Sequence, residues 1–369
     1  MHRTLPAIVT DLEIRANALL ESLTATPPSE LSQRVQSVQR QVQMLRAEAQ
    51  ALRNSLGDPA EAPQQFDLHL DLSRNLLQFE QFDVPLISRW SEADRLMTEM
   101  CHALLSQVGW PFDRPLVACF STEYYWAHPV RKIIGVPANE ERRLLAVGDL
   151  GHELGHLAFV ENSLQFAGPV LVEVARYVQG QLASPPAGLL DDPRVFFGDV
   201  TLAWRGWLQE FGCDAFATYL LGPAFAWQHL RLACMDDAAA MFFDPVGFGD
   251  DHPADDARMR VALIMLRELG HDAQADEIEI RWADLLQVVA AGPTSAYAAA
   301  YPDALLRAVA MRVKAHCESL GLRPYDPTAA DDDVARVVNE AWEQLHADPD
   351  GYAAWESEAL SQRREAWAS

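Results

Sequence analysis

Two histidines four residues apart, His152 and His156, belong to the sequence Gly-His-Glu-Leu-Gly-His at residues 151–156. On a helix, side chains at this spacing lie on one face, so both imidazoles can bind one metal ion. Glu153 directly follows the first histidine, where its carboxylate can reach a water on that metal. The H-E-x-x-H pattern therefore predicts a zinc site with its own general base.

Zinc needs a third protein ligand, and the sequence offers several. A metzincin site would need glycine and histidine three and six residues after the second histidine, but Phe159 and Asn162 stand there. The remaining candidates are glutamates further along the chain. Glu161 is too near to fold back from the same helix, and Glu173 would need a tight helix-turn-helix. Glu210 comes from a later helix.

An aromatic-rich segment, residues 204–221, carries Glu210 and Asp214 four residues apart. Carboxylates among tryptophan, leucine and phenylalanine side chains are costly unless they are paired or bind a metal. This cost favours Glu210 over Glu173 as the third ligand. Asp214, one turn later, is expected to accept the N–H of a ligand histidine and to fix its tautomer.

These motifs resemble those of gluzincin metallopeptidases, and more narrowly of the zinc peptidases of the CAAX-prenyl-protease and heat-shock-protease type. Glu210 and Asp214 match the ligand glutamate and helping aspartate of that family. The sequence His252-Pro253, followed by Arg258, matches a histidine-proline with an arginine at the same offset. The resemblance implies that His252 helps to stabilise the oxyanion and that Arg258 holds the local charge network.

The predicted reaction is zinc-dependent hydrolysis of peptide bonds in a peptide or protein substrate. Zn²⁺ would be held by His152, His156 and Glu210, with water in the fourth position. Glu153 would take the proton of this water and deliver it to the leaving amine. Because the chain has no G-x-M-E-N sequence, endopeptidase action is favoured over trimming from the amino end.

Two alternatives to a peptidase stay open. One is a non-catalytic, zinc-stabilised scaffold or partner-binding protein, although a structural site needs no base such as Glu153. The other is a zinc amidohydrolase that acts on a small amide. A roomy cleft would favour the peptide, and a closed pocket would favour the small molecule.

Composition narrows the class of protein. The 369 residues are 49% hydrophobic, which predicts a sizeable core, and no uninterrupted apolar run reaches the roughly 18 residues that span a bilayer. The first twenty residues lack a signal-peptide apolar block, so we expect a cytoplasmic protein without membrane partners. The net charge of −24 argues against nucleic acid. Five cysteines without a C-x-x-C predict reduced thiols.

The predicted fold class is α+β and predominantly α-helical, with a zincin-like catalytic core and a small β-sheet. Residues 140–160 lack proline and carry apolar residues at helical spacing, which predicts the zinc-binding helix. Two short strands, 115–120 and 131–136, precede it, and an edge strand is expected to pair with extended substrate. Residues 164–200 should link the two ligand helices and form a lid or substrate-selecting loop.

Three domains are predicted: a helical hairpin (1–60), the metallopeptidase core (61–273) and C-terminal helices (274–369). In the hairpin, residues 31–56 keep a heptad spacing that is typical of coiled coils. An intramolecular antiparallel pair is the simpler interpretation. Self-association or a partner protein bound through residues 1–57 is the alternative.

Overall fold

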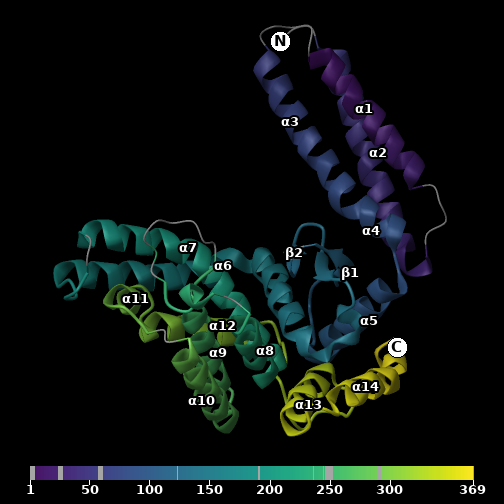
Figure 1. The fold of residues 1–369 in the computed structure, drawn as a ribbon. Coiled ribbons are helices and arrows are strands. Elements are labelled where there is room, and N and C mark those ends of the chain that lie inside the picture. Colours follow the sequence, from purple (N-terminus) through teal and green to yellow (C-terminus); the bar gives the residue numbers. More distant parts are fainter. Residues whose placement is uncertain are drawn as a thin grey trace. The chain divides into compact units, whose positions relative to one another are not determined.

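The structure is a computed structural model. It describes residues 5–23, 28–56, 61–122, 124–189, 192–235, 237–243, 245, 252–289 and 292–368, with only the backbone for 161–165. The chain divides into two compact units, residues 1–92 and 93–369 (Figure 1). Helices dominate both units, and one small sheet lies in the second. The predicted class, α+β and mainly helical, is therefore confirmed.

The first unit is a helical bundle built on the predicted hairpin. Its helices are α1 (Leu5–Ser22), α2 (Ser32–Ser55), α3 (Ala62–Gln78) and α4 (Val84–Arg89), with a π-helical turn at Phe79–Asp83. The heptad positions of α2 are buried against α1 and α3, and they are Val38, Val42, Leu45, Ala49 and Leu52. The coiled-coil pattern thus packs within the chain.

Helix α3 belongs to this bundle rather than to the metallopeptidase core. Leu72 and Leu76 share the apolar core of the hairpin. Arg34 of α2 also pairs with the fully buried Asp83 at 2.6 Å. The predicted boundary after residue 60 therefore moves to residue 92, because a two-helix hairpin leaves an apolar face that α3 covers.

The second unit begins with α5 (Glu92–Val108) and a three-stranded sheet. The strands β1 (Leu116–Ser121), β2 (Trp126–His128) and β3 (Ile133–Pro137) lie in the order β1-β3-β2. β1 runs parallel and β2 antiparallel to β3. The two predicted strands are confirmed, and β2 was missed inside their connection. Its Trp126 ring lies over Gly135, where an added Cβ would come within 2.1 Å of the ring.

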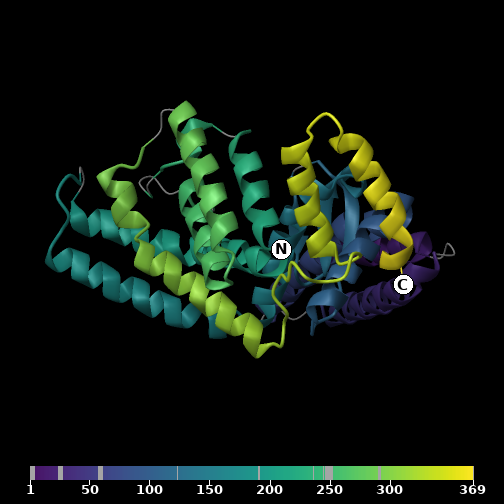
Figure 2. The same ribbon diagram turned by 90° about the horizontal axis from the view of Figure 1, so that it is seen from below.

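Two long antiparallel helices, α6 (Val147–Ala183) and α7 (Pro193–Leu221), form the scaffold of this unit. They lie side by side in both views (Figure 1, Figure 2). Helix α6 starts at residue 147 rather than 140, because Asn139 has a positive φ of 72° and short 3₁₀ turns follow it. It also continues past residue 164, so the predicted linking loop at 164–200 is wrong for most of its length.

Packing explains why α6 runs through Pro169 instead of ending there. Beyond the proline, Val170, Val174 and Val178 stay on the buried face of the helix and join the core of the second unit. Burial of this apolar stripe offsets the roughly 3 kcal/mol that an interior proline costs. The connection to α7 is correspondingly short, residues 184–192, of which 190 and 191 lie outside the described part.

Glycine lets α6 and α7 approach closely at the predicted metal-binding turn. A Cβ at Gly155 would lie 2.8 Å from the Cα of Cys213, and one at Gly151 would lie 2.6 Å from Leu221 Cδ1. Both distances are too short for packed carbon atoms. The two glycines of the H-E-x-x-H region therefore serve the helix crossing.

The helices that follow α7 are α8 (Pro223–Ala233), α9 (Asp255–Glu268), α10 (Asp272–Val288), α11 (Ser295–Ala300), α12 (Asp303–Ser319), α13 (Val334–Ala347) and α14 (Tyr352–Trp367). Of these, α8, α9, α12 and α13 pack on α6 or α7, and α10 and α14 pack on the outer helices. The buried Asp256 joins α9, α10 and α11 by accepting hydrogen bonds from Trp282 at 2.9 Å and Tyr297 at 2.5 Å.

One apolar core extends from α5 to α14. The predicted boundary after residue 273 therefore has no counterpart among the described residues. No helix of the described part is both long enough and apolar enough to cross a bilayer.

Candidate metal centre

The side chains of His152 and His156 on α6 face Glu210 on α7. The Nε2 atom of His152 lies 3.2 Å from Glu210 Oε2, and the Nε2 atom of His156 lies 3.6 Å from Glu210 Oε1. Glu210 Oε2 is buried, and it accepts no well-aligned hydrogen bond from the described residues. Three potential ligand groups from two helices thus converge on one point.

This arrangement suits a tetrahedral zinc ion. Ligand atoms about 2.1 Å from such an ion lie about 3.4 Å from one another. The two nitrogen–oxygen separations, 3.2 Å to Oε2 and 3.6 Å to Oε1, lie close to that value, although they run to different oxygens of Glu210. Without a metal, protonated His152 is the cation beside this carboxylate. The residues present therefore fit the predicted metal.

The second ring nitrogen of each histidine is held by α7. His152 Nδ1 donates to Asp214 Oδ1 at 2.9 Å, which leaves Nε2 free to ligate. His156 Nδ1 lies 2.9 Å from the side-chain amide of Gln209. The atom that faces the ring is the amide nitrogen, which donates to Nδ1. A half-turn of the amide would place its oxygen there instead, to accept from Nδ1–H and leave Nε2 of His156 free to ligate.

Arg258 of α9 completes a chain of charges behind the centre. It donates to the fully buried Asp214 through Nε at 2.8 Å and Nη2 at 2.7 Å. Burial opposes the Asp214 charge, but Arg258 and His152 lower the pKa of this carboxyl nonetheless. Asp214 is therefore ionised, as it must be to accept a hydrogen bond from His152.

The same charges act on the three ligand candidates. Burial disfavours the His152 cation, but Asp214 and Glu210 raise its pKa to about 10. Without a metal, His152 is therefore a cation beside Glu210, and zinc would have to displace the proton on its Nε2. Burial and the His152 charge lower the pKa of His156 to about 4, so this ring is neutral. Burial opposes the Glu210 carboxylate, yet His152 and His156 lower its pKa to about 2. Glu210 is thus an anion, as a metal ligand should be.

Glu153 is buried beside the ligands. Burial, together with the charges of Glu210 and Asp149, raises the pKa of Glu153 to about 7, although His152 opposes the shift. A carboxyl that titrates near neutral pH can both take and return a proton. The geometry therefore gives the predicted base a suitable environment.

His252 lies at the solvent side of the centre. Its side chain is 65% exposed, and its Nε2 is 3.6 Å from Glu210 Oε2. The structure thus brings His252 and Arg258 to the predicted site from a part of the chain 40 to 50 residues beyond Glu210. Residues 246–251, which precede His252, lie outside the described part.

Glu173 is not at this centre. Helix α6 continues without a break from His156 to Glu173, 17 residues further along. At about 1.5 Å per residue, their Cα atoms are roughly 25 Å apart. Glu161 lies in the segment whose side chains are not described.

Cys213 offers a different third ligand. Ligand atoms of His152, His156 and Cys213 all lie within 4.8 Å of one another. However, burial raises the pKa of the Cys213 thiol well above its usual range, whereas zinc binds the thiolate. The thiol also packs against Gly155, so its position already follows from helix packing. The ionised, orphaned Glu210 is the better ligand.

Sequence reasoning missed two polar groups near the centre. One is Gln209, next to the ligand glutamate. The other is Asp149, which accepts hydrogen bonds from Tyr124 at 2.6 Å and from Gln228. Burial raises the pKa of Asp149 to about 6. Asp149 lies three residues before His152 and therefore on the ligand face of α6. This spacing could have identified Asp149 from the sequence.

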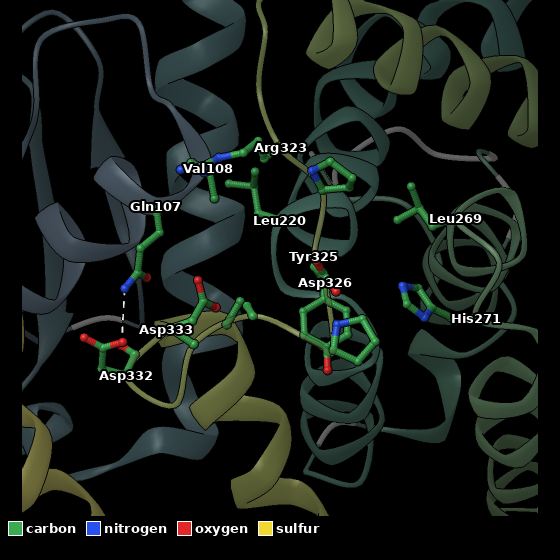
Figure 3. A pocket seen from close by; sticks show the side chains of 15 residues that line it. Gln107, Val108, Leu220, Leu269, His271, Arg323, Tyr325, Asp326, Asp332 and Asp333 are labelled. Atoms are coloured by element: carbon green, nitrogen blue, oxygen red, sulfur yellow. Dashed lines mark hydrogen bonds between the residues drawn. The ribbon is translucent and has the colours of Figure 1, made fainter.

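A separate cavity lies away from this centre. It measures about 820 Å³ and is bordered by residues of the 323–335 segment and by Gln107 and His271 (Figure 3). Gln107 is already bonded to Asp332 and Val334. None of the predicted site residues lines this cavity, so its size is no evidence for the position of an active site.

Comparison with protein-family models, with curated proteins and with solved structures finds no match to this chain.

Proposed function

We propose that the chain is a zinc-dependent peptidase with a zincin-like core, and that His152, His156 and Glu210 bind the zinc. One observation carries the proposal: both histidines use Nδ1 for a contact with α7, so that both Nε2 atoms face the orphaned Glu210 carboxylate.

Bound there, zinc would polarise the scissile carbonyl and acidify a water. Glu153, which follows His152 in the chain and is buried beside the ligands, would accept a proton from that water and pass it to the leaving amine. Asp214 holds His152 in the ligating tautomer, and Arg258 keeps Asp214 charged. His252, exposed at the edge of the centre, stabilises the oxyanion.

The sheet supports a peptide as substrate. Strand β2 forms one edge of the sheet and packs against α6, which carries the two histidines. An extended peptide can bind beside an edge strand through main-chain hydrogen bonds, which do not depend on its sequence. This mode of binding suits an endopeptidase better than an enzyme for a small amide.

A structural zinc site is the second candidate, because the cluster of His152, His156 and Cys213 has a ligand set typical of closed sites. Such a site would need a fourth protein ligand to exclude water, and the chain would then be a scaffold or partner-binding protein. Glu153 argues against it, since a structural site needs no base.

Metal analysis of matched variants separates the two candidates. We expect about one zinc per chain in the wild type, in Cys213→Ala and in Glu173→Ala, but not in Glu210→Ala. Retention of zinc in Glu210→Ala together with its loss in Cys213→Ala would establish the structural site instead. Peptide cleavage that Glu153→Gln abolishes without loss of zinc would then support catalysis, and no zinc in any preparation would refute both.

A further inference from the structure

A second, smaller cavity opens between α6 and α7 next to the candidate metal centre. It measures about 200 Å³. Its apolar lining comes from both helices and consists of Phe159, Val160, Phe166, Ala167 and Leu208. Among the described side chains, two polar residues, Arg205 and Gln209, also line the cavity, and both are exposed. The cavity is therefore an apolar hollow with polar groups at its mouth.

Gln209 connects this cavity to the metal centre. The same side chain lines the cavity and bonds to Nδ1 of His156 at 2.9 Å. Phe159 and Val160 follow His156 by three and four residues, which is one helical turn, or about 5.4 Å along α6. Because an extended peptide advances about 3.3 Å per residue, a side chain in the cavity belongs to a residue within about two positions of the scissile bond.

The floor of the cavity is aromatic and rigid. The rings of Phe159 and Phe166 stack with centroids 4.4 Å apart, and both residues are buried. They rest on the backbone of α7 at Gly212, where an added Cβ would come within 2.9 Å of Phe166. Leu208, also buried, closes one side. None of the described side chains of this floor is charged.

The size of the cavity matches a large apolar side chain. A cavity of about 150 Å³ lined by leucine, isoleucine and phenylalanine holds a benzene molecule. At about 200 Å³, this cavity has room for the side chain of phenylalanine, leucine or methionine. A charged side chain would lose its hydration there without gaining a partner in the floor.

We infer that this cavity is a specificity subsite that binds a phenylalanine, leucine or methionine side chain of the peptide substrate, within two residues of the scissile bond. The inference rests on the proposed peptidase function and adds the class of substrate. Val160, half-exposed at the mouth of the cavity, controls entry.

Two phenylalanine substitutions on α6 test this subsite. Val160→Phe fills the mouth, whereas Val172→Phe places the same ring outside the cavity; the two valines are 48% and 58% exposed. Each variant and the wild type would digest the same mixed peptide pool, with cleavage sites identified by mass spectrometry. A missing methylene in an apolar pocket changes kcat/KM by about 10–200-fold. We therefore expect at least a tenfold preference for large apolar residues in the wild type and in Val172→Phe.

Loss of that preference in Val160→Phe, with cleavage retained, would support the subsite. Cleavage without any such preference, or with one that Val160→Phe leaves unchanged, would overturn the subsite and leave the peptidase standing. Absence of cleavage in all three proteins would overturn the proposed function, and the subsite with it.

A binding measurement does not depend on catalysis or on how well the variants fold. Benzene titrated into wild-type protein with ¹³C-labelled methyl groups should shift the NMR signals of Leu208 and Val160 and leave those of Val172 unchanged. Equal shifts at all three residues, or none at Leu208, would show that the cavity does not accept an apolar ring and would overturn the inference.

Discussion

The guanidinium of Arg258 is the counter-charge of a carboxylate that is shielded from water. Asp214 is fully buried and receives two hydrogen bonds from Arg258, at 2.8 and 2.7 Å. Arg258→Leu would leave this charge with His152 as its only charged hydrogen-bond partner in the described chain. Loss of one partner of a buried ion pair costs about 3–5 kcal/mol of unfolding free energy. At about 2–4 °C per kcal/mol, Tm should fall by roughly 6–20 °C.

Arg267→Leu provides a matched control on the same helix, α9. Arg267 pairs with Asp276 at 2.9 Å and Glu279 at 2.6 Å, but both carboxylates are exposed, so their loss should cost less than about 1 kcal/mol. Urea unfolding followed by circular dichroism, with EDTA in every sample, measures both variants without a contribution from bound metal. If Arg258→Leu and Arg267→Leu lower the unfolding free energy equally, the argument that Arg258→Leu leaves a buried, uncompensated charge on Asp214 would be refuted.

The double variant Asp214→Asn, Arg258→Leu refines the test. It removes the stranded charge together with its partner, so it should be more stable than Arg258→Leu alone. A double variant that is less stable would mean that the cost arises from lost packing of the arginine stem rather than from the charge.

Three further predictions concern groups around the centre. Gln209→Leu should weaken zinc binding by roughly 10–100-fold in a chelator competition, and Gln209→Glu, which still accepts from the histidine, should not. Because burial raises the pKa of Asp149 to about 6, the native protein holds a proton that the unfolded chain loses above about pH 4. This carboxyl should therefore lower the unfolding free energy by up to about 3 kcal/mol as pH rises from 4 to 6. Glu153 and His156 also titrate in this range, so the contribution of Asp149 is read as the difference between wild type and Asp149→Asn in urea titrations with EDTA. Gly155→Ala, whose Cβ would lie 2.8 Å from a backbone atom of α7, should lower the unfolding free energy by about 1–3 kcal/mol, whereas Gly206→Ala in open space should raise it by about 1 kcal/mol. Equal zinc affinities of Gln209→Leu and wild type would contradict the first prediction. Parallel pH profiles of wild type and Asp149→Asn would contradict the second, and equal effects of Gly155→Ala and Gly206→Ala the third.

The ligand candidates could be read from the sequence because each depends on local spacing. His152 and His156 are one turn apart on any helix, and Glu210 and Asp214 are one turn apart on another. Burial then decided between Glu210 and Glu173, since an acidic residue among aromatic side chains needs a cation. The structure brings the favoured set together, with Arg258 behind it.

Features set by contacts distant in sequence were less predictable. Pro169 indicates a helix end by its chemistry, yet α6 continues because its apolar face is covered by the core. Strand β2 has only three residues, and it forms because Trp126 finds a glycine opposite it on β3. In both cases the deciding partner is a packing surface that no local pattern reveals.

The separation of α6 and α7 determines both the packing and the chemistry of this centre. The Gly155–Cys213 contact brings the two helix backbones together one residue before Asp214. At that distance Asp214 reaches His152 Nδ1, and Gln209 reaches His156 Nδ1, each at 2.9 Å. Helices held further apart by a side chain at position 155 would lose both bonds, and the two rings could then turn their Nε2 atoms away from Glu210. Gly155 is therefore as much a part of the centre as the histidines. It allows α7 to approach closely enough for its side chains to reach the two Nδ1 atoms and fix the tautomers of the rings.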